Sequence, residues 1–132
     1  MHLIICVDER DGLSFCGRRL SRDSVLNRHI LALTAGHKLW MHPDSAKLFS
    51  EEGIFTDEAC LKKAETGEYC FLETKVPAHI ESLESVILYC WNRAYPSTEK
   101  FPRQLLESMH LVHEEEFSGS SHEKITMQRY VL

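Results

Sequence analysis

The chain has 132 residues, of which 43% are hydrophobic and 27% charged. This composition is typical of a folded domain and excludes a disordered chain, and the length suits one domain over residues 1–132. The net charge is −5 with the histidines neutral. An acidic chain is poorly suited to bind nucleic acid, since that binding depends on neutralising phosphates.

In chain order, the apolar patterns predict strands and helices in alternation. The expected elements are a strand over residues 3–7, a helix over 21–35, a strand over 38–41, helices over 43–49 and 56–67, a strand over 69–72, a helix over 77–83 and a strand over 86–91. The four strand segments are apolar throughout, which is typical of a parallel sheet covered on both faces.

Residues with known positional preferences mark the ends of the expected helices. Gly36 is a suitable C-cap for the first helix, and Thr56 a suitable N-cap for the third. Pro43 and Pro77 suit the first turns of the second and fourth helices.

The last part of the chain has a different pattern. Residues 109–117 and 123–131 flank the turn sequence Ser118-Gly119-Ser120-Ser121, which predicts an antiparallel hairpin at the edge of the sheet. The expected fold is therefore a three-layer α/β domain with a mostly parallel sheet and an antiparallel C-terminal hairpin. An exposed edge of this kind also allows a homodimer.

Cysteine usage and the N-terminus indicate the compartment. The five cysteines include no Cys-x-x-Cys pair, the first residues lack the features of a secretory signal, and no apolar run reaches the roughly 18 residues that a membrane helix needs. We expect a soluble cytoplasmic protein with reduced thiols and no contact with membranes.

Several short stretches resemble one known family in their order along the chain. They are Ile4-Ile5-Cys6-Val7-Asp8-Glu9-Arg10-Asp11-Gly12, Thr34-Ala35-Gly36-His37-Lys38-Leu39-Trp40-Met41, the segment from Val86 to Pro102, Leu111-Val112 with Glu114-Glu115-Glu116-Phe117, and Arg129-Tyr130 near the C-terminus. In this order they resemble dihydrofolate reductase over most of the chain. The resemblance implies the dihydrofolate reductase fold.

The residues that the family uses for chemistry are mostly different here. The position of the family's substrate-binding carboxylate falls on Leu26, and the nearest acid, Asp23, lies about one helical turn earlier. Where the family has Leu-Pro-Trp, this chain has Arg19-Leu20-Ser21-Arg22. The resemblance therefore does not carry the family's substrate site to this chain.

The segments that hold the cofactor in the family also differ. Of the family's phosphate-binding residues only Ser45 matches, within His42-Pro43-Asp44-Ser45, and Asp44 would repel a phosphate. Glu73-Thr74 replaces the Gly-Gly that lets the backbone approach the nicotinamide cofactor. We expect Glu73 to obstruct NADPH and repel its pyrophosphate, so no cofactor is expected.

One group of residues is the best candidate for a ligand- or partner-binding surface. Trp91, Arg93 and Tyr95 lie where the chain passes from a buried strand into a loop. Residues of these types concentrate at binding sites. Trp40 and His42, at a neighbouring strand end, are candidates for the same surface. The alternative is that Trp91 covers the core and Arg93 pairs with an acid.

Other segments have catalytic or metal-binding residue types but unsuitable spacing. His110-Leu111-Val112-His113-Glu114 is expected on a strand, where it is neither a zinc helix motif nor its inverse. Ser120-Ser121-His122-Glu123-Lys124 contains a nucleophile, a base and an acid, but consecutive residues do not line up as a catalytic triad. Cys16, near Arg18 and Arg19, is either a reactive thiol or a plain surface thiol.

These observations favour a non-catalytic module that binds a small molecule or a protein partner. The alternative is a divergent NADPH-dependent reductase. The chain also resembles short bacterial proteins labelled ribonuclease Z, which would imply a metal-dependent nuclease. That class requires a His-x-His-x-Asp-His cluster, which the sequence lacks.

Overall fold

The computed structural model describes all of residues 1–132. Its strands are β1 (His2–Val7), β2 (Gly12–Phe15), β3 (Arg18–Arg19), β4 (Leu39–Met41), β5 (Ile54–Thr56), β6 (Tyr69–Leu72), β7 (Ser85–Cys90), β8 (Glu99–Lys100), β9 (His110–Phe117) and β10 (Ile125–Val131). Its helices are α1 (Ser24–Leu33), α2 (Pro43–Ala46), α3 (Cys60–Lys63) and the 3₁₀ helix η1 (Arg103–Leu106).

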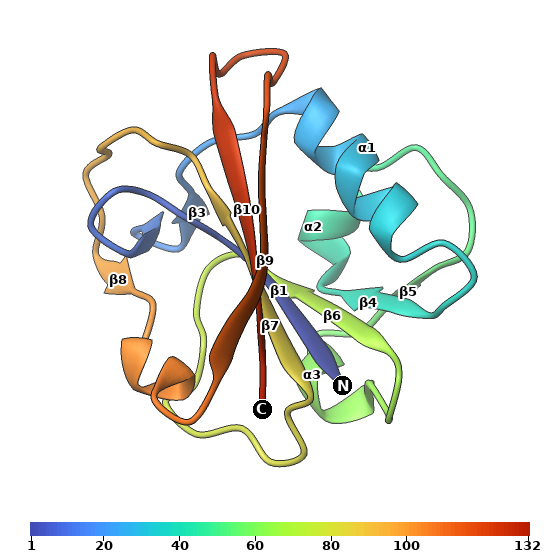
Figure 1. The fold of residues 1–132 in the computed structure, drawn as a ribbon. Coiled ribbons are helices and arrows are strands. Elements are labelled where there is room, and N and C mark those ends of the chain that lie inside the picture. The colour runs from blue at the N-terminus through green and yellow to red at the C-terminus, as the bar shows by residue number, and fades with distance from the viewer.

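Seven strands form the main sheet in the order β5-β4-β6-β1-β7-β10-β9 (Figure 1). The first five are parallel to their neighbours, and β10 pairs antiparallel with both β7 and β9. The structure confirms the mostly parallel sheet and the C-terminal hairpin with β9 at its edge. The strands β3, β2 and β8 form a separate small sheet that the sequence analysis did not predict.

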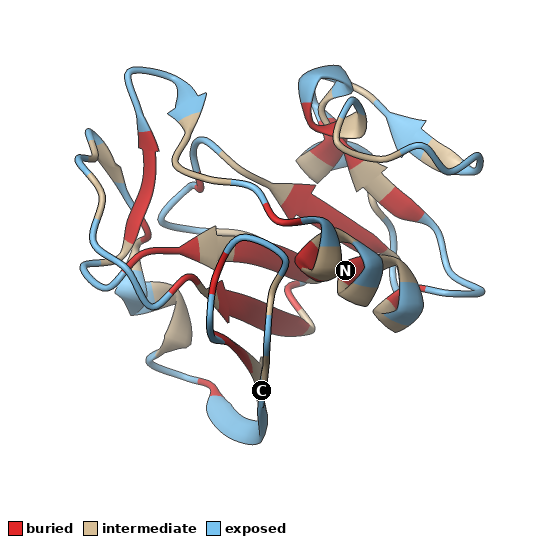
Figure 2. Cartoon of the chain, turned by 90° about the horizontal axis from the view of Figure 1, so that it is seen from above, coloured by how far each residue is buried: buried red, intermediate tan, exposed pale blue.

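Apolar side chains alternate between two core layers, one on each face of the main sheet. In β1, Leu3 and Ile5 pack on one face and Ile4 on the other. Leu26 and Ile30 of α1 cover the layer of Ile4, whereas α3 and several loops cover the opposite layer. Figure 2 shows the buried residues along the central strands and the exposed ones around them. None of the helices has the length and apolar character needed to cross a bilayer.

Helix α1 begins where a buried carboxylate accepts its free backbone N–H groups. The Asp23 Oδ1 atom lies 2.9 Å from the amide nitrogen of Val25 and 3.2 Å from that of Leu26. The helix ends at Leu33, earlier than expected, and its C-cap is Thr34 rather than Gly36, which adopts a φ of +83° two residues later. The predicted helix is confirmed with shorter limits.

The other expected helices are shorter or absent. The second ends at Ala46, and α3 comprises only one turn. Thr56 is not an N-cap because it ends β5, a strand that the sequence analysis missed. The prediction of a helix over 77–83 is wrong: this segment is a loop, and Ser82 has a φ of +56°, which a helix excludes.

Candidate functional site

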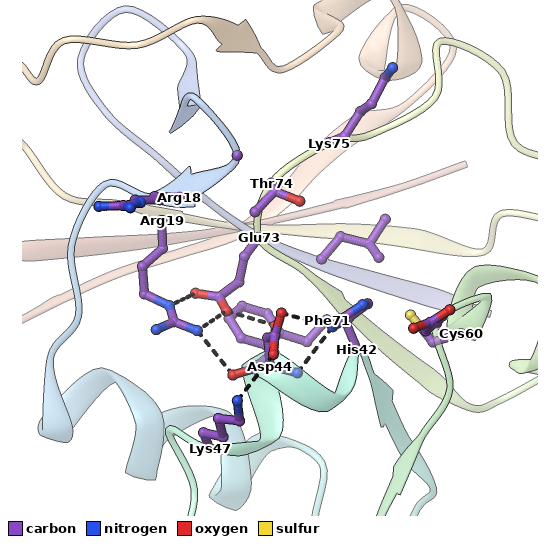
Figure 3. Close-up of a pocket in the computed structure, with 14 residues that line it drawn as sticks. Arg18, Arg19, His42, Asp44, Lys47, Cys60, Phe71, Glu73, Thr74 and Lys75 are labelled. Atoms are coloured by element: carbon purple, nitrogen blue, oxygen red, sulfur yellow. Dashed lines mark hydrogen bonds and ion pairs between the residues drawn. The ribbon is translucent and has the colours of Figure 1, made fainter.

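A cleft of about 850 Å³ opens beside the carboxyl ends of β4 and β6, where open α/β sheets commonly bind ligands (Figure 3). Fourteen residues line it, and only three of these are hydrophobic. The three are Cys60, Phe71 and Leu72. The cleft is therefore suited to polar groups rather than to a flat aromatic ring.

The Glu73 carboxylate lies in this cleft and accepts hydrogen bonds from Arg19 and Ser45 (Figure 3). The Arg19 guanidinium binds it with two hydrogen bonds, from Nε to Oε2 at 2.8 Å and from Nη2 to Oε1 at 3.0 Å. The Ser45 hydroxyl donates to Oε1 at 2.7 Å. These contacts connect β3, α2 and the end of β6 across the cleft.

The pairing changes the electrostatic expectation for Glu73. The hydrogen bonds that Glu73 accepts, together with its charge, raise the pKa of Arg19 above its ordinary value. Arg19 thus compensates the negative charge of Glu73. The expectation that Glu73 repels a pyrophosphate is corrected, because the ion pair carries no net charge. The carboxylate still occupies the cleft, and it holds both Arg19 and Ser45.

The rest of the cleft wall carries both signs of charge. Lys47 pairs with Asp44 at 3.2 Å, whereas Arg18 and Lys75 have no ion-pair partner. His42 caps α2 by accepting the backbone N–H of Asp44 at 3.0 Å. His42 therefore lies in the cleft, but its Nδ1 atom is already used.

A second polar cluster surrounds His122, whose side chain is only 1% exposed. Its Nδ1 atom lies 3.0 Å from Asp23 Oδ2, and its Nε2 atom lies 3.1 Å from the hydroxyls of Ser21 and Tyr95. The imidazole stacks on Trp91 with ring centroids 4.6 Å apart. This cluster brings the C-terminal hairpin turn against the start of α1.

Asp23 accepts hydrogen bonds from both segments that it connects, the start of α1 and the hairpin turn. Besides capping α1 it accepts the backbone N–H groups of Ser120 at 2.9 Å and Ser121 at 2.8 Å. Burial alone would raise the pKa of Asp23, but the hydrogen bonds from Ser120, Ser121 and His122 lower it far below its usual range. A Cβ atom on Gly119 would collide with this carboxylate, which explains why the turn contains glycine.

Ser21, His122 and Asp23 follow the nucleophile–base–acid order of hydrolase triads. However, the imidazole is enclosed by Trp91 and Tyr95, and the neighbouring cavity beside Asp23 includes neither Ser21 nor His122. We therefore interpret the cluster as a clamp between the hairpin and α1. Only the tertiary structure reveals it, because Asp23 and His122 are 99 residues apart.

The five residues predicted to bind a ligand or partner lie in four places. Trp91 and Tyr95 belong to the His122 cluster, Arg93 is exposed, and His42 lines the cleft. Trp40 packs on the opposite face of the sheet from Trp91 and donates from Nε1 to Glu68 at 3.0 Å. The structure therefore does not bring Trp40 and Trp91 together on one surface.

The remaining candidate residues lie on the surface. His110 and His113 lie on the strand β9, as predicted; both are exposed, and His113 lies 3.5 Å from Glu115. No group of three or more His, Cys, Asp or Glu side chains is arranged to hold a metal ion. Cys16 is exposed in the turn between β2 and β3.

In its fold, the chain is similar to a protein of known structure. No known family matches the chain, and no curated protein is similar to it in sequence. Among solved structures, it is similar to dihydrofolate reductase from Enterococcus faecalis complexed with NADP(H) and RAB-propyl, with a TM-score of 0.70 and 11% identity over 98% of this chain and 94% of that one. The chain thus has a dihydrofolate reductase-like fold. The resemblance to ribonuclease Z receives no support.

Proposed function

We propose that this chain is a non-catalytic module that binds a small polar ligand in the cleft between Arg19, Glu73 and Lys75. The observation that carries the proposal is the Glu73 carboxylate held by Arg19 and Ser45. This arrangement occupies the place where a reductase of this fold would need an open backbone and free phosphate-binding groups.

The lining of the cleft supports a polar ligand over a nicotinamide or a pterin. Eleven of the 14 lining residues are not hydrophobic (14 − 3), whereas sites for flat aromatic ligands are mostly apolar. Arg18 and Lys75 lack ion-pair partners and favour a ligand with at least one acidic group. The proposed ligand class is a small, polar, acidic molecule.

A divergent NADPH-dependent reductase is the second candidate. It is favoured by the similarity in fold to an enzyme whose structure contains NADP(H). In this alternative, Glu73 must swing away so that Arg19 becomes available to the cofactor's phosphates. The two candidates therefore differ in whether NADPH displaces Glu73 from Arg19.

Thermal unfolding with NADPH separates the two candidates. We expect millimolar NADPH or folate to leave the unfolding midpoint of the native chain unchanged. A bound ligand at a hundred times its dissociation constant stabilises a protein by about 2.7 kcal/mol, which shifts the midpoint by several degrees. Such a shift with NADPH would refute the proposed binding module and support the reductase.

Replacing Glu73 with alanine tests the role of this carboxylate directly. The change frees the Arg19 guanidinium and the Ser45 hydroxyl, so we expect inorganic pyrophosphate to raise the unfolding midpoint of Glu73→Ala by at least about 2 °C and that of the native chain by less. The matched control is Glu58→Ala, because Glu58 is an acid that lines the same cleft but forms no ion pair. An equal response in both variants would show that general charge, and not Glu73, excludes phosphate.

A further inference from the structure

Two buried thiols, those of Cys60 and Cys70, lie close together. Cys60 lies at the end of the cleft away from Arg19 (Figure 3). The Sγ atoms of Cys60 and Cys70 are 3.6 Å apart. Cys60 is the first residue of α3 and lines the cleft, whereas Cys70 lies in the middle of β6 and is fully buried. One sulfur of the pair is thus next to the cleft, and the other lies behind it in the core.

We propose that Cys60 and Cys70 form a redox-active dithiol, which peroxide entering the cleft oxidises to an intramolecular disulfide. The Cys60 thiolate attacks one oxygen of hydrogen peroxide, the O–O bond breaks, and hydroxide leaves, so that Cys60 becomes a sulfenic acid. The Cys70 sulfur then attacks the Cys60 sulfur, the S–O bond breaks, and the Cys70 proton leaves with the hydroxyl group as water. The hydroxide takes up the proton that Cys60 lost when it ionised, so two thiols are oxidised and one peroxide is reduced to two waters.

The geometry requires only a local movement. A disulfide bond is about 2.05 Å long, so the two sulfurs must approach by about 1.5 Å. β6 is held between β4 and β1, and therefore Cys60 has to move. It begins a helix of a single turn with no side-chain N-cap, so rotation of its side chain disturbs little regular structure.

The environments of the thiols assign the attacking role to Cys60. The Cys70 thiol donates a hydrogen bond to the Cys60 sulfur, and this contact lowers the pKa of Cys60. The same contact raises the pKa of Cys70. Burial raises the pKa of Cys6, and it raises that of Cys90 to about 11. Among these four cysteines, Cys60 is the thiol best able to ionise and meet an oxidant in the cleft.

The test is to treat the reduced native chain with a small excess of hydrogen peroxide and analyse it by intact and peptide mass spectrometry. We expect a loss of about 2 Da, a linked pair of peptides carrying Cys60 and Cys70, and full reversal by dithiothreitol. Free thiols should fall from five to three (5 − 2). Neither result depends on a ligand, so the proposed binding function is tested separately.

Single variants separate the roles of the two cysteines. Cys70→Ala should trap the sulfenic acid on Cys60, which dimedone then labels, whereas Cys60→Ala should leave Cys70 reduced. Cys16→Ser is the matched control, since it removes an exposed thiol without affecting the pair. Oxidation of Cys16 in the native chain while Cys60 and Cys70 stay reduced would overturn the proposal, as would dimedone labelling of Cys70 in Cys60→Ala.

Discussion

Replacing Trp91 with alanine is expected to lower the free energy of unfolding by about 3–5 kcal/mol, which is typical of truncating a buried aromatic side chain. Trp91 is 4% exposed, packs in the core layer beneath α1 and stacks on His122. The variant loses this packing and also opens one side of the buried imidazole. The loss should therefore appear without any ligand.

The measurement is urea unfolding of the native chain and two variants. Arg93→Ala is the matched control, because Arg93 comes from the same segment but is exposed, and its change should stay within about 0.5 kcal/mol. A loss below about 1 kcal/mol for Trp91→Ala would argue that the indole is not a core element. It would then favour the sequence-based interpretation of Trp91 as a ligand- or partner-binding residue.

Asp23→Asn is expected to cost about 3–5 kcal/mol, because several buried donors lose their acceptor and each unsatisfied buried donor costs about 1–3 kcal/mol. The Asp23 side chain has no exposed surface and accepts hydrogen bonds from α1, from the hairpin turn and from His122. An asparagine carries an NH₂ group in place of one oxygen, and this group would face donors. Both the N-cap and the clamp are therefore weakened.

Asp57→Asn is a suitable control for this change. Asp57 also accepts a backbone N–H near a helix start, that of Ala59 at 2.7 Å, but this contact is exposed. We expect its loss to cost no more than about 1 kcal/mol by urea unfolding. Equal effects of the two substitutions would contradict the special role of the Asp23 clamp.

Asp23 should also contribute to the loss of stability in acid. Its pKa in the folded chain lies far below the ordinary value of about 3.9 that it regains on unfolding. The ionised carboxylate therefore stabilises the fold above that ordinary value, and this stabilisation is lost as the pH falls toward the folded pKa. Urea midpoints measured from pH 7 to pH 3 should fall more steeply for the native chain than for Asp23→Asn.

Some acid sensitivity should remain in Asp23→Asn. Burial alone would raise the pKa of Asp8, but the backbone N–H groups of Tyr95, Gly12 and Arg10 lower it, so Asp8 adds to the slope in the same direction. Identical slopes in the native chain and in Asp23→Asn would show that Asp23 is not a significant source of the acid effect.

The elements that the sequence predicted well are those whose burial leaves a long local pattern. β1 and β7 are apolar at nearly every position because helices or loops cover both of their faces. The errors concern short elements: β5 has three residues and α3 one turn, too few for a period to be recognised. Pro77 suits a helix start, but residues 77–83 form a loop, with Val76 and Leu83 buried at its two ends.

By itself, the sequence determined the α/β class, the parallel central strands and the antiparallel hairpin. These features depend on continuous apolar segments, on the alternation of strands with helices and on turn residues, all of which are local along the chain. Only the tertiary structure decided that Arg19 neutralises Glu73, that Asp23 holds His122, and that Cys60 meets Cys70. The first two pairs are 54 and 99 residues apart. The physical reason is that strand order and crossovers, which no local pattern encodes, determine which distant side chains become neighbours.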